Sequence, residues 1–256
     1  MAFELSVNLE YGFTEAGDKI EDRIAAAAAA GFRKVELFLL KGRDLDAIKA
    51  ALDANGVELI STVADYVTQL VDPATHEGFC EVFREAASAA KFLGCSNVVV
   101  TSGRGVPWLK RPVQLSIFAD ALRKILPIAE ELDVTILLES ANTRHDHPGV
   151  LCSTTHDSVV VADMLDSPRV KVLYDLYHSV VEGEDPDEAL AAAMHHVVHV
   201  QIADAPGRGE PGSGKIDWPE ALARFERLGY KGTIGLELQP TKPSVEAFGY
   251  IRGLCA

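Results

Sequence analysis

The stretch VTILLES, residues 134–140, decides the fold because it is an apolar run that ends in a carboxylate, Glu139. The runs NVVVT (residues 97–101) and VVHVQI (residues 197–202) are similar, since their apolar residues mostly follow one another instead of alternating with polar ones. Strands of this kind are buried on both faces, as in parallel sheets covered by helices. These runs therefore predict a parallel α/β architecture.

Similar short runs occur eight times, and a longer amphipathic segment follows each of them. The predicted strands are Glu4–Asn8, Lys34–Phe38, Glu58–Val63, Asn97–Thr101, Val134–Glu139, Val170–Tyr174, Val197–Ile202 and Thr233–Leu238. The predicted helices are Ile20–Ala30, Asp44–Asn55, Gly78–Leu93, Pro112–Leu132, Asp157–Leu165, Asp187–His195, Trp218–Leu228 and Val245–Leu254. Eight βα units in 256 residues predict an α/β fold, a (β/α)8 TIM barrel, with residues 1–256 forming a single domain.

A doubly wound open sheet shares this alternation and is the alternative architecture. Such sheets that bind dinucleotides carry a GxGxxG loop after an early strand, and the sequence has none. The segment GRG, residues 103–105, is too short to supply one. The count of eight strands therefore favours the closed barrel.

The composition excludes several classes of partner. The 38 acidic residues outnumber the 24 basic ones and give a formal net charge of −14, whereas nucleic-acid binding requires a basic surface. No run of about 18 uncharged apolar residues predicts a membrane span, and MAFELSVNLEYG lacks the pattern of a signal peptide. No metal-binding spacing links the cysteines, which we expect to be reduced: Cys80, Cys95, Cys152 and Cys255. We predict a cytoplasmic protein with no nucleic-acid and no membrane partner.

Polar side chains recur at the ends of four successive predicted strands. In an α/β barrel these ends form the open mouth where catalytic groups lie. Glu139, Asp175, Gln201 and Glu237 are separated by 36, 26 and 36 residues, close to one βα unit of about 30 residues each. We therefore expect these four side chains to converge on one point.

Three carboxylates at one point would repel one another and raise each other's pKa, and a divalent cation removes that conflict. An all-oxygen set of three carboxylates and one amide suits Mg²⁺ or Mn²⁺ better than Zn²⁺. Each carboxylate could instead cap a helix or form a salt bridge, but four in register favour the metal. The sequence therefore predicts a Mn²⁺ or Mg²⁺ site.

The histidines are interpreted in two groups. We place His178 on strand six, as a partner of the metal ligands or a substrate contact or, alternatively, an ordinary buried histidine. His195, His196 and His199 lie near the start of strand seven, at the bottom of the barrel, where a structural role is expected.

These residues together resemble the xylose-isomerase-like sugar isomerase/epimerase barrels and, within them, the hydroxypyruvate isomerase branch. Four stretches carry the resemblance, which covers essentially the whole chain: LLESANTR (137–144), YDLYHSVVEGE (174–184), QIADAPGRGEPGSGKIDW (201–218) and GLELQP (235–240). Ketose 3-epimerases have His where this chain has Gln201, which favours the hydroxypyruvate isomerase branch. ADYVTQLVDPATHEGF (64–79) and HDHPGVL (145–151) depart from the branch in loops that shape the substrate pocket.

The resemblance implies that Glu139, Asp175, Gln201 and Glu237 bind the metal and that the two glutamates also transfer the proton. A carboxylate on the substrate needs a cationic partner, for which Arg208 is the first candidate, ahead of Lys215 and Arg104. Alternatively, Arg208 is an arginine of the loop that is exposed to solvent and does not bind substrate. Asp204 and Lys215 either contact the substrate or order the loop around Arg208.

The expected activity is metal-dependent isomerisation of a small sugar or hydroxy-oxo acid, of the hydroxypyruvate or tartronate semialdehyde type, through an enediolate. Epimerisation of a ketose or inosose, elimination from an oxidised (3-oxo) sugar or glycoside, and non-catalytic binding are alternatives. An endonuclease of this architecture would carry more metal-binding histidines and a basic face. The partner is a small-molecule substrate, and because such barrels commonly pair, the resemblance allows a homo-oligomer.

Overall fold

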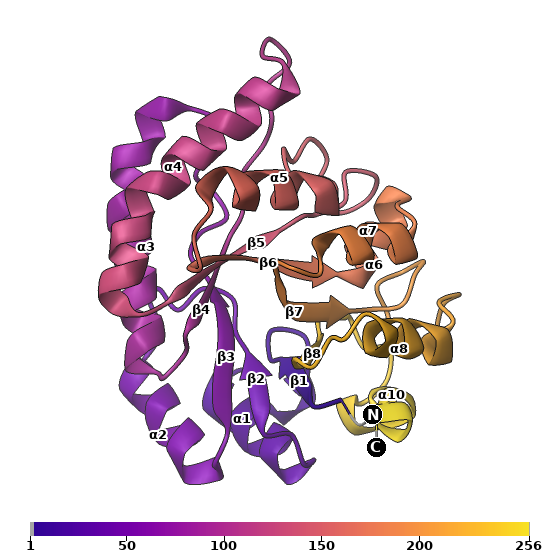
Figure 1. Ribbon diagram of the computed structural model, residues 1–256. Coiled ribbons are helices and arrows are strands. Elements are labelled where there is room, and N and C mark those ends of the chain that lie inside the picture. The colour runs from indigo at the N-terminus through magenta and orange to yellow at the C-terminus, as the bar shows by residue number, and fades with distance from the viewer. Residues whose placement is uncertain (1–2, 256) are drawn as a thin grey trace.

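Eight parallel strands close into a barrel in the order β1 to β8, which confirms the predicted (β/α)8 TIM-barrel fold (Figure 1). The structure is a computed structural model and describes residues 3–255, so residues 1, 2 and 256 of the predicted domain lie outside it. The strands are β1 Leu5–Asn8, β2 Lys34–Glu36, β3 Glu58–Val63, β4 Asn97–Val100, β5 Thr135–Glu139, β6 Val170–Asp175, β7 Val197–Ile202 and β8 Ile234–Leu236.

Helices cover the outside of the barrel, and short 3₁₀ turns occur at Thr14–Ala16 and Pro73–Thr75. The α-helices are α1 Ile20–Ala29, α2 Leu45–Asn55, α3 His76–Phe92, α4 Arg111–Leu132, α5 Thr155–Leu165, α6 Leu176–Glu182, α7 Pro186–Ala193, α8 Trp218–Arg227, α9 Ser244–Ala247 and α10 Gly249–Cys255. None of these helices combines the length and the hydropathy that a bilayer crossing requires.

Several predicted elements differ from the structure by one or two residues at an end, and two predictions differ in kind. Strand six ends at Asp175 and α6 follows at once, so the placement of His178 on a strand was wrong. The cause is local, because Asp175 Oδ1 accepts hydrogen bonds from the backbone N–H groups of Tyr177 and His178 and thereby caps α6. The last predicted helix, Val245–Leu254, is divided into α9 and α10 where Gly249, a poor helix former, follows Phe248.

The interior of the barrel is apolar on one side and polar on the other. Val63, Val99, Leu137 and Leu173, from β3 to β6, form one buried apolar cluster. Facing it from β1, β2, β3 and β7 are the buried polar side chains Ser6, Glu36, Ser61, His199 and Gln201. Burying polar groups costs free energy of folding unless the groups are hydrogen-bonded to each other. The hydrogen bonds of these five side chains are therefore described with the site below.

Strand register brings the predicted ligands onto the inner face. Asp175 pairs with Gln201, and Gln201 pairs with Gly235, which lies two residues before Glu237. Glu139 pairs with Leu173, two residues before Asp175. Because side chains alternate between the faces of a strand, all four predicted ligands share the inward-facing parity.

Candidate active site

A cavity of about 550 Å³ opens at the C-terminal ends of the strands. Six of the residues predicted to form the site line it: Arg104, Glu139, His178, Gln201, Arg208 and Glu237. Its wall also includes apolar and aromatic side chains that had not been predicted, namely Tyr11, Leu37, Phe38, Val63, Tyr66, Val99, Pro148 and Val150. The cavity is therefore polar at its base and largely apolar around its wall.

The predicted ligands gather at the base of this cavity. Glu139 and Asp175 each place an oxygen within 4.8 Å of the other and of a ring nitrogen of His178. Gln201 and Glu237 line the same cavity as Glu139. The structure thus brings three carboxyl groups and one amide into one small region.

The protonation of these carboxyl groups is strongly perturbed. Burial raises the pKa of Glu139 well above its usual value, and the charges of Glu237 and Asp175 raise it further. Burial also raises the pKa of Glu237 to about 7, although Arg208 opposes the rise and Asp175 adds to it. Crowded carboxylates in a buried site resist ionisation unless a positive charge joins them.

Two oxygens at the base accept no hydrogen bond from any of residues 3–255. They are Asp175 Oδ2 and Gln201 Oε1, both fully buried. Buried acceptors almost always have a partner, so an exception calls for an explanation such as a bound ion. An acceptor pair beside two further carboxylates is the donor set that a hard divalent cation prefers, so the residues present fit Mn²⁺ or Mg²⁺.

The ring of His178 is held in one tautomer by the loop after β5. Its Nδ1 accepts a hydrogen bond from the backbone N–H of Asn142 at 3.3 Å and lies 2.6 Å from the Asn142 side-chain Nδ2. The proton of the neutral ring is therefore on Nε2, which lies 3.7 Å from both Glu139 Oε1 and Asp175 Oδ2. Burial lowers the pKa of His178 to about 4, so the ring is neutral beside the two carboxylates.

Arg208 lies inside the site instead of in solvent. Its Nη2 donates to Glu237 Oε1 at 2.6 Å, and both side chains are buried. The guanidinium packs over the rings of Tyr11 and Tyr177, 6.0 and 5.2 Å from their centroids. Asn8 Nδ2 donates to the other oxygen of Glu237 at 3.2 Å. Glu237 is thus held from two sides, by a charge and by an amide.

The other predicted substrate contacts, Asp204, Lys215 and Arg104, do not lie at the base of the cavity. Asp204 lies under the loop that carries Arg208, where its carboxylate accepts hydrogen bonds from Gly212 N, Ile216 N and Trp218 Nε1. Lys215 is exposed and is not part of the cavity lining. Arg104 is exposed on the rim, where its guanidinium donates to the backbone oxygen of Pro148. Asp204 thus orders the loop, and Arg104 alone of these three reaches the cavity.

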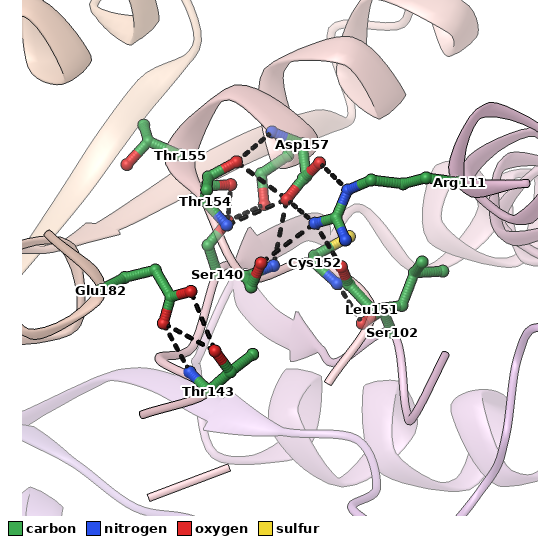
Figure 2. Close-up of polar contacts among 12 residues, drawn as sticks. Ser102, Arg111, Ser140, Thr143, Leu151, Cys152, Thr154, Thr155, Asp157 and Glu182 are labelled. Atoms are coloured by element: carbon green, nitrogen blue, oxygen red, sulfur yellow. Dashed lines mark hydrogen bonds and ion pairs between the residues drawn. The ribbon is translucent and has the colours of Figure 1, made fainter. Parts of the chain in front are cut away.

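The loop between β5 and α5 forms part of the cavity wall and is anchored at both ends (Figure 2). Near its start, Thr143 bonds to the Glu182 carboxylate through its backbone N–H and its hydroxyl. At its end, Thr154 and Asp157 form a reciprocal capping box on α5, and Arg111 bonds to the same Asp157 carboxylate. The wall residues between these anchors are therefore held in place by partly buried hydrogen bonds at both ends of the loop.

Sequence reasoning missed one charged group beneath the site. Glu36, on β2, is 1% exposed, and its carboxylate bonds to Ser6, Ser61, His199 and Gln201. Although burial alone would raise its pKa, His199 and the two hydroxyl donors hold the pKa of Glu36 at about 2. A carboxylate within the apolar run KVELF (residues 34–38), on the second strand, is the signal in the sequence that points to this group.

The histidines predicted at the bottom of the barrel separate into two places. His195 and His196 lie on the outer surface beside Asp163, at 3.7 and 2.7 Å. His199 is buried inside the barrel, where its Nε2 lies 3.0 Å from Glu36 Oε2. Its position on β7, two residues before Gln201 and with the same inward parity, explains the difference.

Comparisons with known proteins agree with the barrel fold. Residues 24–254 match the family described as the xylose isomerase-like TIM barrel. A candidate hydroxypyruvate isomerase of Streptomyces coelicolor is 32% identical, over 96% of this chain and 94% of its own length. The 2-oxo-tetronate isomerase of Cupriavidus necator is 29% identical, over 90% of this chain and 91% of its own length.

A solved structure named as a family 2 AP endonuclease, from Brucella melitensis, superposes with a TM-score of 0.88 at 23% identity and covers 98% of both chains. At that identity the likeness concerns the fold alone. The family match and the two isomerase relatives extend over nearly the whole chain. This chain therefore belongs to the xylose isomerase-like TIM-barrel family.

Proposed function

We propose that this chain is a metal-dependent isomerase that interconverts the carbonyl and the neighbouring hydroxyl of a small sugar or hydroxy-oxo acid. Hydroxypyruvate and tartronate semialdehyde are the substrate type, in line with the names of the isomerase relatives. The observation that carries the proposal is the pair of buried, unpartnered oxygens, Asp175 Oδ2 and Gln201 Oε1, beside Glu139 and Glu237.

The metal would be held by Glu139, Asp175, Gln201 and Glu237, and Mn²⁺ or Mg²⁺ suits these oxygen ligands. When bound, it acts as a Lewis acid that stabilises the negative charge developing on the substrate oxygens. It also accounts for the clustered carboxyl groups, since burial, and after it the charge of Asp175, raises the pKa of both Glu139 and Glu237.

Proton transfer is assigned to the two glutamates. A general base works best when its pKa lies near the working pH, and the pKa of Glu237 is about 7. One glutamate carboxylate removes the proton from the hydroxyl-bearing carbon beside the carbonyl, and a glutamate returns a proton to the former carbonyl carbon. The hydroxyl proton passes to the former carbonyl oxygen, so the carbonyl and the hydroxyl exchange places. Arg208 holds Glu237 in place, and the neutral ring of His178 lies 3.7 Å from both Glu139 and Asp175.

Substrate orientation falls to the cationic side chains of the cavity. Among the lining residues in the described part of the chain, these are Arg104 at the rim and Arg208 at the base. A substrate carboxylate would bind to one of them, while the carbonyl and hydroxyl oxygens point to the carboxylate cluster. Arginine suits this role because its planar donors match a carboxylate.

The experiment is a turnover screen in which metal-stripped protein receives Mn²⁺, Mg²⁺ or excess chelator. Hydroxypyruvate, tartronate semialdehyde and four-carbon oxo acids are the first substrates, with the reaction run in D₂O to follow solvent deuterium into the product. Metal-dependent interconversion with deuterium uptake supports the proposal. Full activity of the chelator-treated protein contradicts the metal role.

The size of the cavity favours a second candidate. A volume of about 550 Å³ lies in the range of sites that enclose drug-sized ligands, and Tyr11, Phe38 and Tyr66 line its wall. This room suits an epimerase of a ketose or inosose, or a lyase acting on an oxidised (3-oxo) sugar or glycoside. Adding ketoses and oxidised glycosides to the screen separates the candidates, since an epimer or an olefinic product replaces the isomer.

A further inference from the structure

A buried polar cluster lies directly beneath the predicted ligands. Glu36 Oε2 accepts hydrogen bonds from Gln201 Nε2 at 2.8 Å and from Ser61 Oγ at 2.8 Å, and lies 3.0 Å from His199 Nε2. Its other oxygen, Oε1, accepts from Ser6 Oγ at 2.6 Å. A buried carboxylate is expensive compared with an apolar side chain, so a position that retains one calls for an explanation.

The hydrogen bond between Glu36 and Gln201 fixes the orientation of the Gln201 amide. Glutamine ends in one acceptor oxygen and one donor nitrogen of nearly equal size, so only its neighbours decide which end faces a given point. An ionised carboxylate accepts hydrogen bonds and donates none. Because Glu36 binds the Gln201 nitrogen, the Gln201 oxygen is turned away from Glu36, and it is one of the buried oxygens that have no hydrogen-bond partner in the described residues.

Gly235 leaves the space that the Glu36 and Gln201 side chains occupy. A Cβ on Gly235 of β8 would lie 2.1 Å from Glu36 Oε1 and 3.1 Å from Gln201 Cγ. Any other residue at that position would displace the carboxylate or the amide. Gly235 thus makes room for the Glu36–Gln201 contact, and Ser6, Ser61 and His199 hold the Glu36 carboxylate in place.

We propose that Glu36 is a positioning residue that orients the Gln201 amide with its oxygen toward the cation. The inference rests on the proposed function, because it assumes that a divalent cation binds Gln201 Oε1. Glu36 itself does not contact the cation; it makes glutamine a dependable oxygen ligand by occupying the nitrogen. Residues of this kind typically change metal affinity tenfold to a hundredfold.

The test measures Mn²⁺ affinity directly, by titrating metal-stripped protein and following free Mn²⁺ by EPR. Glu36→Met removes the acceptor at similar volume, and Glu36→Val is made in parallel because valine suits a strand and is smaller. Either variant is expected to weaken Mn²⁺ binding by about tenfold to a hundredfold. Thermal unfolding in chelator identifies the variant that folds.

Two further variants separate orientation from packing. Glu36→Gln keeps an acceptor oxygen for Gln201 while its nitrogen can donate to Ser6, so its affinity is expected to stay within about threefold of wild type. In the Glu36→Met/Gln201→Glu double variant, a carboxylate presents an oxygen whichever way it turns, so Mn²⁺ affinity is expected to recover. Glu58→Met, the same change at an exposed site on β3, is the matched control.

The outcomes are distinct. Weak binding in Glu36→Met together with recovery in the double variant supports the orienting role. Wild-type affinity in Glu36→Met or Glu36→Val, or a loss that Gln201→Glu does not restore, overturns it while leaving the cation site intact. Failure of the wild-type protein to bind Mn²⁺ overturns the proposed cation site and this inference with it.

Discussion

Arg208 Nη2 lies 2.6 Å from Glu237 Oε1, in an ion pair whose two side chains are both buried at the base of the cavity. The pair places a fixed positive charge against one of the two glutamates assigned to proton transfer. Truncating one partner of such a pair leaves the other charge buried and unpaired, so its consequences are large and measurable.

The first prediction concerns Arg208 and pH. Arg208 lowers the pKa of Glu237, so Arg208→Met should raise that pKa above its value of about 7. Less of the Glu237 carboxylate is then ionised at neutral pH, and the acid limb of the pH profile of kcat/KM moves to higher pH. Arg208→Lys retains the charge and should shift the limb less. An unshifted profile in Arg208→Met would show that the pair does not tune Glu237.

The second prediction concerns Glu139. Glu139→Gln removes the proton-transfer group while retaining shape, so turnover should fall by about 10²–10⁴-fold. Circular dichroism and thermal unfolding should remain close to wild type because only one carboxylate is replaced. Glu130→Gln, an exposed change on α4, is the control. Normal turnover in Glu139→Gln would remove Glu139 from the mechanism.

The third prediction concerns stability and pH without metal. The pKa of Glu237 is raised from 4.5 to about 7 in the folded protein, so the folded state binds its proton more tightly than the unfolded state. That contribution is complete below about pH 4.5 and is lost as pH rises through about 7. It amounts to something on the order of 3 kcal/mol.

The measurement is denaturant unfolding of metal-free protein across this pH range. Wild-type protein should lose stability relative to Glu237→Gln as pH increases, because the glutamine cannot ionise. Added Mn²⁺ should restore stability to the wild type above pH 7, since the cation binds the ionised form. Parallel stability curves for the two proteins would contradict the raised pKa.

The fourth prediction concerns the loop between β5 and α5. Asp157 belongs to the capping box with Thr154 and also binds Arg111. Asp157→Ala should lower the free energy of unfolding by about 1–2 kcal/mol and loosen the cavity wall. KM should therefore rise more than kcat falls. The control is His156→Ala, an exposed change on the same helix. An unchanged KM in Asp157→Ala would show that this anchor does not affect substrate binding.

Local patterns were enough to predict the barrel and the approximate positions of its strands. Consecutive apolar residues such as Ile136–Leu138 can be satisfied only when both faces of a strand are buried, and this requirement is written in the chain itself. The spacing of Glu139, Asp175, Gln201 and Glu237 likewise indicated one shared site, because parallel strands end at the same rim. Capping changed the details, since Asp175 ends β6 and caps α6, a helix that the apolar pattern had not predicted.

The amino-acid sequence by itself determined which residue types stand at the strand ends, and hence the class of chemistry they can perform. Only the tertiary structure decided which of them meet: Glu36 with Gln201, His199 with Glu36, and Arg208 with Glu237. Those pairs lie 165, 163 and 29 residues apart. Closure of the barrel and the inward parity of each strand bring them together, and neither is encoded in any single segment.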